Sequence, residues 1–113
     1  MSGITTHVLD TSRGRPASGV PVLLEIQAAD GWREIGRALT DGDGRARQLL
    51  PAGSALATGI YRLTFGIETY FRTQGIDGFY PEAAIVFHVR DANQHYHVPL
   101  LLSPYGYSTY RGS

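Results

Sequence analysis

The stretch VPVLLEIQAADGWREIGRALT, residues 20–40, decides the fold of this chain. Its first part alternates, so that in an extended chain one row of apolar side chains points to one face, as in a β-strand with one buried side. That row is Val20, Val22, Leu24 and Ile26. The Asp30-Gly31 dipeptide that follows is typical of a tight hairpin turn, and residues 32–40 supply the returning strand. Residues 20–40 therefore predict a β-hairpin packed against a core.

The same pattern continues in both directions. Short β-prone segments recur with turn-rich joins between them, and one segment without alternation, residues 68–74 ending at Gly75, predicts a short helix. Such spacing is typical of a sandwich, so we expect an all-β fold: a two-sheet antiparallel β-sandwich of about eight strands with one short helix. The predicted strands are 4–9, 20–28, 32–40, 45–50, 60–67, 83–90, 95–102 and 105–110.

Length and composition exclude several classes of binding partner and of catalysis. The 113 residues predict a single domain, 1–113, and ten basic against ten acidic side chains give no net charge. We therefore expect neither nucleic acid nor a membrane as partner, because both need clustered positive charge. Lysine and cysteine are absent, which excludes Schiff-base chemistry, thiol nucleophiles and cysteine-ligated zinc. No targeting segment is visible, and a cytoplasmic location is the default expectation.

The histidines are the first candidates for chemistry. His95 and His97 are two residues apart, so on a strand they share a face, and His7 lies on another predicted strand. Three interpretations stay open: a polar outer face, a zinc site with three nitrogen ligands, or general acid–base catalysis. His88, between Phe87 and Val89, is expected to be a structural histidine.

A turn and the C-terminal tail add further candidates. Asp41-Gly42-Asp43-Gly44 lacks the later ligands of a calcium loop, so a tight turn is the better account. Arg45 follows directly; such a residue faces water or clamps an anionic or urea-like ligand with its guanidinium fork. The tail carries Tyr110, Arg111 and Ser113, and only the tyrosine has an obvious packing role.

Several motifs resemble one enzyme family, the 5-hydroxyisourate hydrolases or transthyretin-related proteins. The similarity runs along essentially the whole chain, and its most specific part is the terminal Tyr-Arg-Gly-Ser. The other matching segments are Thr6-His7-Val8-Leu9-Asp10-Thr11, Gly31-Trp32, Asp43-Gly44-Arg45, Asp77-Gly78-Phe79-Tyr80-Pro81 and His95-Tyr96-His97-Val98-Pro99-Leu100-Leu101-Leu102-Ser103-Pro104.

The resemblance implies a transthyretin-like fold, a homotetramer with channels between its dimers, and no cofactor or metal. The implied reaction is hydrolysis of 5-hydroxyisourate to 2-oxo-4-hydroxy-4-carboxy-5-ureidoimidazoline, a step of urate degradation. The alternative is a transthyretin-like carrier of small ligands without catalysis. The implied catalytic residues are His7, Arg45, His97 and Ser113, and the implied substrate contacts are His7, Arg45, His95, Tyr110 and Arg111.

The chemistry of ring opening suggests a role for each group. Two of the histidines, His7 and His97, are expected to form a general base and its orienting partner. Arg45 would hold substrate oxygens and stabilise charge on the carbonyl. Tyr110 would contact the flat ring, Ser113 would donate to substrate or leaving group, and Arg111 would anchor the tail.

The end of the chain also predicts self-association. Leu100, Leu102, Tyr105 and Tyr107 lie in the last two predicted strands. On a small sandwich such a run would leave an apolar surface and an unpaired strand edge, which a second copy can cover.

Overall fold

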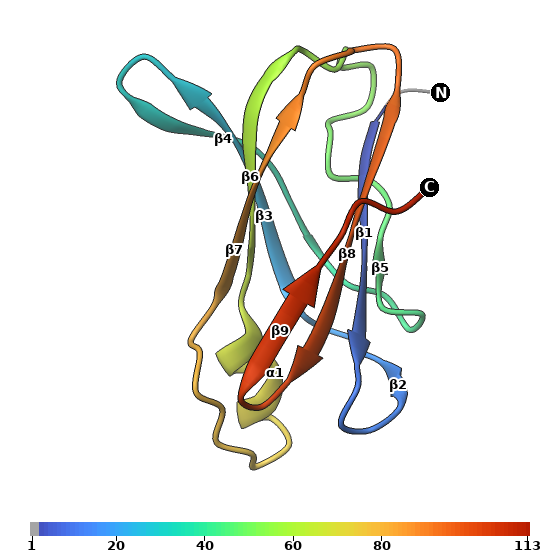
Figure 1. The fold of residues 1–113 in the computed structure, drawn as a ribbon, viewed down its shortest axis with the longest axis vertical. Coiled ribbons are helices and arrows are strands. Elements are labelled where there is room, and N and C mark those ends of the chain that lie inside the picture. Colours follow the sequence, from blue (N-terminus) through green and yellow to red (C-terminus); the bar gives the residue numbers. More distant parts are fainter. Residues whose placement is uncertain (1–2) are drawn as a thin grey trace.

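The computed structural model describes residues 3–113 and consists of two β-sheets packed face to face (Figure 1). One sheet has the order β2-β1-β8-β9, with β5 also paired to β1; the other has the order β4-β3-β6-β7. The strands are β1 (Gly3–Asp10), β2 (Arg15–Pro16), β3 (Pro21–Ala28), β4 (Gly31–Leu39), β5 (Arg45–Ala46), β6 (Gly59–Phe65), β7 (Ala83–Val89), β8 (His95–Ser103) and β9 (Gly106–Thr109). The predicted sandwich is confirmed.

Among the residues that the structure describes, no helix has the length and apolar character that a membrane span needs.

One strand pair departs from the expected antiparallel arrangement. β1 and β8 run parallel, with Thr5 opposite His97 and Gly3 opposite His95. Turn residues report only on strands that are neighbours in sequence, and these two are separated by most of the chain. The patterns of turn residues and alternation therefore could not predict that β1 and β8 are parallel.

The strand expected at residues 45–50 shortens to the two residues of β5. Leu49 turns into the core, where it is 1% exposed. Its carbonyl oxygen lies 1.8 Å from the place that a Cβ would take on Gly36 of β4. After Ala46 the chain therefore no longer pairs with β1 and packs against the other sheet. The carbonyl of Leu49 can approach β4 so closely only because residue 36 is a glycine.

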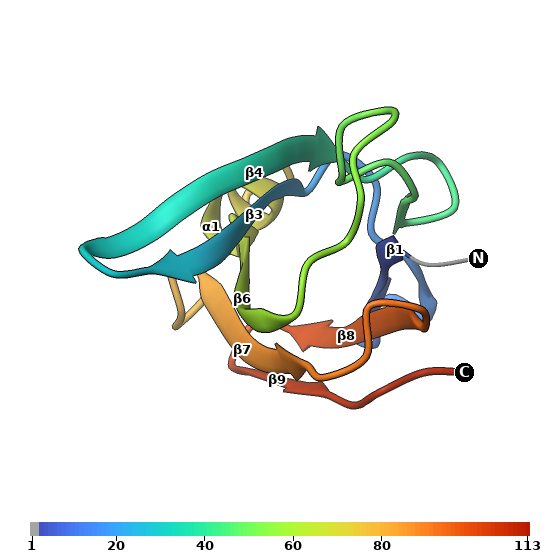
Figure 2. The ribbon, with the colours of Figure 1, turned by 90° about the horizontal axis from the view of Figure 1, so that it is seen from above.

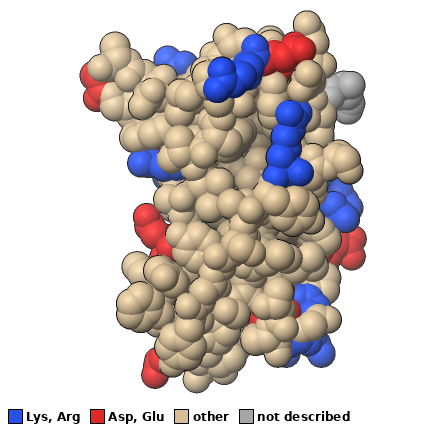
Figure 3. Space-filling model, viewed as in Figure 1, with Lys and Arg blue, Asp and Glu red and all other residues tan. Residues whose placement is uncertain are grey.

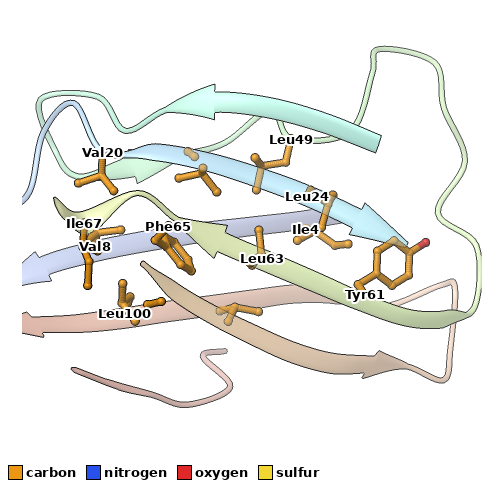
Figure 4. Close-up of a cluster of buried hydrophobic side chains, with 14 of the residues drawn as sticks. Ile4, Val8, Val20, Leu24, Leu49, Tyr61, Leu63, Phe65, Ile67 and Leu100 are labelled. Carbon is orange, nitrogen blue, oxygen red and sulfur yellow. The ribbon is translucent and has the colours of Figure 1, made fainter. Parts of the chain in front are cut away.

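The core lies between the two sheets; seen from above, β3 and β4 lie on one side of the molecule and β8 and β9 on the other (Figure 2). On β3 the predicted alternation holds, because Val22, Leu24 and Ile26 are buried while the residues between them are not. Side chains from both sheets meet there (Figure 4), and they include Ile4, Val8, Leu63, Phe65 and Leu100. Since alternate residues point outward, the outer face of β1 and β8 is free to carry polar groups.

The predicted helix is present as α1 (Ile67–Arg72), which buries Ile67, Tyr70 and Phe71. Tyr70 donates a hydrogen bond of 2.7 Å to Oδ2 of Asp10, a fully buried carboxylate at the end of β1. Burial, followed by the hydrogen bond to Asp10, raises the pKa of the Tyr70 hydroxyl. The hydroxyl therefore stays protonated as a donor and ties the helix to the first sheet.

We expect Tyr70→Phe to lower the free energy of unfolding by about 1.5–3 kcal/mol, the range for hydrogen bonds to charged groups. Equilibrium urea unfolding measures the change. Tyr105→Phe is the matched control, because Tyr105 is 73% exposed and its loss of a hydroxyl should change little. Equal stability of the two variants would contradict the role given to Tyr70.

The predicted apolar surface at the chain end needs one correction. Leu100 and Leu102 are fully buried in the chain's own core, because both occupy the inward positions of β8. Tyr105 and Tyr107 remain on the surface. In the view of Figure 3, charged side chains lie mainly near the top and along the rims, and the area over β9 is without them.

Candidate active site

The candidate site is built on the outer face of β1 and β8. Thr5 and His7 are alternate, outward residues of β1, and His95 and His97 are alternate, outward residues of β8. The parallel register then brings the two rows side by side, with Thr5 opposite His97. The prediction that His95 and His97 share a face is thus confirmed, and the face is the solvent side of the sheet.

A turn places Arg45 next to these rows. The carboxylate of Asp41 accepts hydrogen bonds from the backbone N–H groups of Asp43 and Arg45, and Gly44 closes the turn at a φ of 77°. The N–H group of Arg45 is the main cause that lowers the pKa of Asp41. β5 then pairs with β1 so that Arg45 lies opposite His7. The expected tight turn is confirmed.

The two arginines beside this turn differ in their partners. Arg47 pairs with Asp41 at 3.2 Å and with Asp43 at 3.9 Å. Arg45 forms no ion pair within residues 3–113, although it is only partly exposed. Its guanidinium is thus the positive group that is ready for a ligand oxygen.

A cavity of about 350 Å³ opens between these elements. Its walls come from β1, β5, β8 and the chain end, and polar side chains dominate them. The lining residues are Thr5, Thr6, Arg45, Arg47, His95, His97 and Ser113. Four of the predicted site residues therefore share one cavity: Arg45, His95, His97 and Ser113.

The tail reaches the cavity by crossing His97, and its end lies on the same side of the molecule as the start of β1 (Figures 1 and 2). The N–H of Gly112 donates a 2.8 Å hydrogen bond to the carbonyl of His97. Arg111 donates a 2.9 Å hydrogen bond to Oε1 of Gln94, and its guanidinium carbon lies 4.6 Å from the ring centroid of Tyr96. These contacts hold the tail so that Ser113 lines the cavity.

Gly112 packs directly on the imidazole of His97. A Cβ at this position would lie 2.6 Å from Cδ2 of the ring, which is closer than atoms tolerate. We therefore expect Gly112→Ala to push the tail and the ring apart and to lower activity about 10²-fold, the cost of misplacing a site group by about 1 Å. Steady-state kinetics measure the loss.

Gly106→Ala is the matched control for Gly112→Ala. A Cβ on Gly106 would meet only Oγ of Ser103 at 3.8 Å, an ordinary contact. The free energy of unfolding should change by less than about 0.5 kcal/mol in the Gly112 variant, because the strain falls on the end of the chain. Full activity of Gly112→Ala would show that the tail does not need this contact.

The surroundings of His97 favour its neutral form. Burial lowers the pKa of His97 below the ordinary 6.5, and the positive charge of Arg45 and the neighbouring His7 and His95 lower it further. A neutral imidazole has a lone pair that can accept a proton. Within residues 3–113, no protein group hydrogen-bonds to Nε2 of His97, so this nitrogen is available to a ligand in the cavity.

His7 has a different hydrogen-bonding pattern. Its Nε2 lies 2.9 Å from the carbonyl oxygen of Asp43. Since a carbonyl only accepts, Nε2 of His7 must carry the hydrogen. His7 does not line the cavity, and within residues 3–113 the side chain that shares a hydrogen bond with the ring of His97 is Thr5 and not His7. A positive charge on His7 would lower the pKa of His97.

Two further residues lie apart from the cavity. Tyr110 is 56% exposed and lines a separate cavity of about 260 Å³ beside β7, together with Arg111. His88 is exposed on the outer face of β7, so the expectation of a structural histidine is wrong. The strand leaves His88 outside because its buried positions are Ala83 and Val89.

The sequence interpretation missed Thr5 and Arg47. Thr5 hydrogen-bonds to both His95 and His97, and Arg47 lines the cavity. The alternation that places Thr5 on the face of His7 was the available signal, but its partners depend on the parallel pairing of β1 with β8.

Within the described part of the chain, no group of three or more His, Cys, Asp or Glu side chains is placed to hold a metal ion.

Comparison with known proteins places these features in a family. The family model described as HIUase/Transthyretin family matches residues 4–112. A probable 5-hydroxyisourate hydrolase of Caenorhabditis elegans is 49% identical over 112 residues, which cover 99% of this chain and 82% of the relative. The 5-hydroxyisourate hydrolase of Caulobacter vibrioides is 48% identical over 117 residues, with both chains covered completely.

Solved structures agree with the sequence relatives. The structure of Klebsiella pneumoniae 5-hydroxyisourate hydrolase superposes with a TM-score of 0.86 at 36% identity, covering 99% of this chain and 100% of that one. Sea bream transthyretin in complex with thyroxine gives a TM-score of 0.89 at 32% identity, covering 96% of this chain and 93% of that one. The chain therefore belongs to the HIUase/transthyretin family.

Proposed function

We propose that this chain is a 5-hydroxyisourate hydrolase, which converts 5-hydroxyisourate to 2-oxo-4-hydroxy-4-carboxy-5-ureidoimidazoline in urate degradation. The observation that carries the proposal is the cavity in which a neutral His97, Ser113 and Arg45, which has no ion pair within residues 3–113, converge. Curated hydrolases that are 46–49% identical to the chain support the substrate.

The first chemical step is the attack of water on the ring carbonyl. His97 is the general base: Nε2 takes a proton from the water as its oxygen bonds to the carbonyl carbon, a contribution of about 10²- to 10⁴-fold. Arg45 faces the oxygen on which negative charge develops and stabilises it. When the C–N bond breaks, the protonated His97 returns its proton to the leaving nitrogen, so the base is regenerated.

The remaining residues bind and position the substrate. The Ser113 hydroxyl, which lines the cavity, donates to the substrate or the leaving group. His7, paired opposite Arg45, tunes the charge of the site, and Arg111 anchors the tail. Tyr110 remains a proposed substrate contact, although in this chain it lines a different cavity.

The proposal includes assembly as a homotetramer. Exposed aromatic side chains beside β9 support it: Tyr80 packs edge-on against Tyr107 with ring centroids 5.2 Å apart, and Phe79 adds to the same cluster. Since few charges lie over β9 (Figure 3), a second copy can cover this area without desolvating ions. Sedimentation equilibrium measures the mass of the assembly.

Addition of purified protein to freshly generated 5-hydroxyisourate tests the proposed reaction. We expect the near-ultraviolet absorbance of the substrate to decay faster than it does spontaneously. The carrier alternative predicts a stoichiometric spectral change without turnover. No acceleration at micromolar protein would refute the hydrolase.

The pH dependence follows from the pKa of His97. Because burial and Arg45 lower this pKa below 6.5, His97 stays neutral, and thus able to act as a base, at pH values where a free imidazole is already protonated. We expect the acid limb of kcat/KM to have its midpoint below pH 6.5. A profile over the acid range, corrected for spontaneous decay, measures it. A midpoint above the ordinary value would contradict the assignment of His97 as base.

A further inference from the structure

The hydroxyl of Thr5 lies between two imidazole rings. Its Oγ1 is 2.8 Å from Nε2 of His95 and 2.9 Å from Nδ1 of His97. The three side chains lie on the outer face of the sheet, and the parallel register of β1 and β8 brings them together. The family motifs that point to the histidines assign no role to this threonine.

Simple hydrogen-bond accounting restricts the proton positions in this chain of groups. A hydroxyl has one hydrogen to donate and accepts through its lone pairs. It can therefore satisfy only one of the two ring nitrogens as an acceptor, and at least one of them must carry a hydrogen. If Thr5 donates to His95, then Nδ1 of His97 must be the donor to Thr5.

We propose that Thr5 is a positioning residue that selects the tautomer of His97: its hydroxyl donates to Nε2 of His95 and accepts from Nδ1–H of His97. A neutral imidazole carries one hydrogen, so Nε2 of His97 is left with its lone pair toward the cavity. This inference rests on the proposed function, in which that lone pair takes the proton of water. It also assigns His95 to the support of Thr5 and leaves the substrate to other groups.

The surroundings of both rings fit this arrangement. His97 is faced by Arg45 from β5, by His7 from β1 and by Gly112 from the tail. None of these three groups forms a hydrogen bond with a ring nitrogen of His97 within residues 3–113. The hydroxyl of Thr5 does, so Thr5 selects the nitrogen that carries the hydrogen.

His95 is more open to solvent than His97. Nδ1 of its ring lies beside Gly3, 3.5 Å from the position of a hypothetical Cβ, and Arg47 shares the cavity with it. Within residues 3–113, Arg111 donates to the backbone carbonyl of His95, at 3.4 Å, and not to its ring. Because His95 is exposed and no protein group within residues 3–113 hydrogen-bonds to its Nδ1, solvent can accept a hydrogen from Nδ1, which leaves Nε2 free to accept from Thr5.

Thr5→Val removes the hydroxyl but keeps the branched shape of the side chain. We expect kcat to fall about 10- to 100-fold, the range seen when the partner that orients a metal-bound imidazole is removed. KM should change little, because Thr5 acts through His97. Thr5→Ser, which restores a hydroxyl, should recover most of the activity.

Thr11→Val is the matched control. Thr11 also donates a side-chain hydrogen bond to β8, to the carbonyl of Leu102 at 3.1 Å, but at the far end of the same strand pair. The Thr11→Val variant should have the same activity as the unmodified protein. A double-mutant cycle adds His95→Ala: because both residues act on one proton position, the double variant should lose no more than Thr5→Val alone.

The direct test is the ¹⁵N spectrum of the imidazoles, which reports the protonated nitrogen without any substrate; His97→Asn assigns the resonances. At alkaline pH we expect His97 to carry its hydrogen on Nδ1 in the unmodified protein and in Thr5→Ser, and to become a mixture of tautomers in Thr5→Val. A hydrogen on Nε2 of His97, or full activity of Thr5→Val, would overturn the inference while leaving the hydrolase intact. An unmodified protein without turnover would instead refute the proposed function.

Discussion

Replacing His97 by asparagine is expected to lower the turnover of 5-hydroxyisourate about 10²- to 10⁴-fold, the contribution of a positioned general base. The asparagine amide can still donate to Oγ1 of Thr5 from near the place of Nδ1, so the local hydrogen bond survives. What disappears is the basic nitrogen that faces the cavity. Stopped-flow absorbance on fresh substrate measures kcat and KM.

His88→Asn is the matched control for His97→Asn. The substitution is chemically identical, but His88 is exposed on the outer face of β7, in the other sheet. Its activity should be unchanged. Circular dichroism and sedimentation should show that both variants keep the fold and the assembly. If His97→Asn turns over substrate at the normal rate, His97 has no place in the mechanism.

Arg45→Lys is expected to lower turnover about 10²- to 10³-fold, the effect of removing one donor from a site that stabilises an oxyanion. Lysine keeps the positive charge but loses the planar fork that can hold two oxygens at once. The effect is large because Arg45 is free of ion pairs within residues 3–113, whereas the neighbouring Arg47 is paired with Asp41.

Arg37→Lys is the matched control for Arg45→Lys. Arg37 is an exposed arginine of β4 whose side chain pairs with Glu34 at 2.9 Å, away from the cavity. It should retain full activity, because exposed pairs contribute little. Equal kinetics of the two variants would mean that the cavity uses only the charge of Arg45 or does not use Arg45 at all.

Prediction from sequence succeeded where the signal was local. The alternation in residues 20–28 and the Asp30-Gly31 turn anticipated β3 and β4 because side-chain direction and turn conformation depend on immediate neighbours. It failed at residues 47–50, where Leu49 is drawn into the core beside Gly36, and at His88, whose apolar neighbours did not make it buried.

For the candidate site, too, local features could be predicted from the sequence and contacts between distant segments could not. The amino-acid sequence alone shows which side chains are available for chemistry, since without lysine and cysteine the candidate groups are histidine, arginine, tyrosine and serine. It also determined that His95 and His97 share a face, because that follows from a period of two.

Which of these groups lie next to one another depends on the tertiary structure. The parallel pairing of β1 with β8 places Thr5 between His95 and His97, and the tail crosses His97 at Gly112. Tyr110, only three residues before Ser113, lies beside a different cavity. The hydrogen bonds of Thr5 join residues some 90 positions apart. The physical reason is that such pairings are selected by burial of the whole core, which no local pattern of residues encodes.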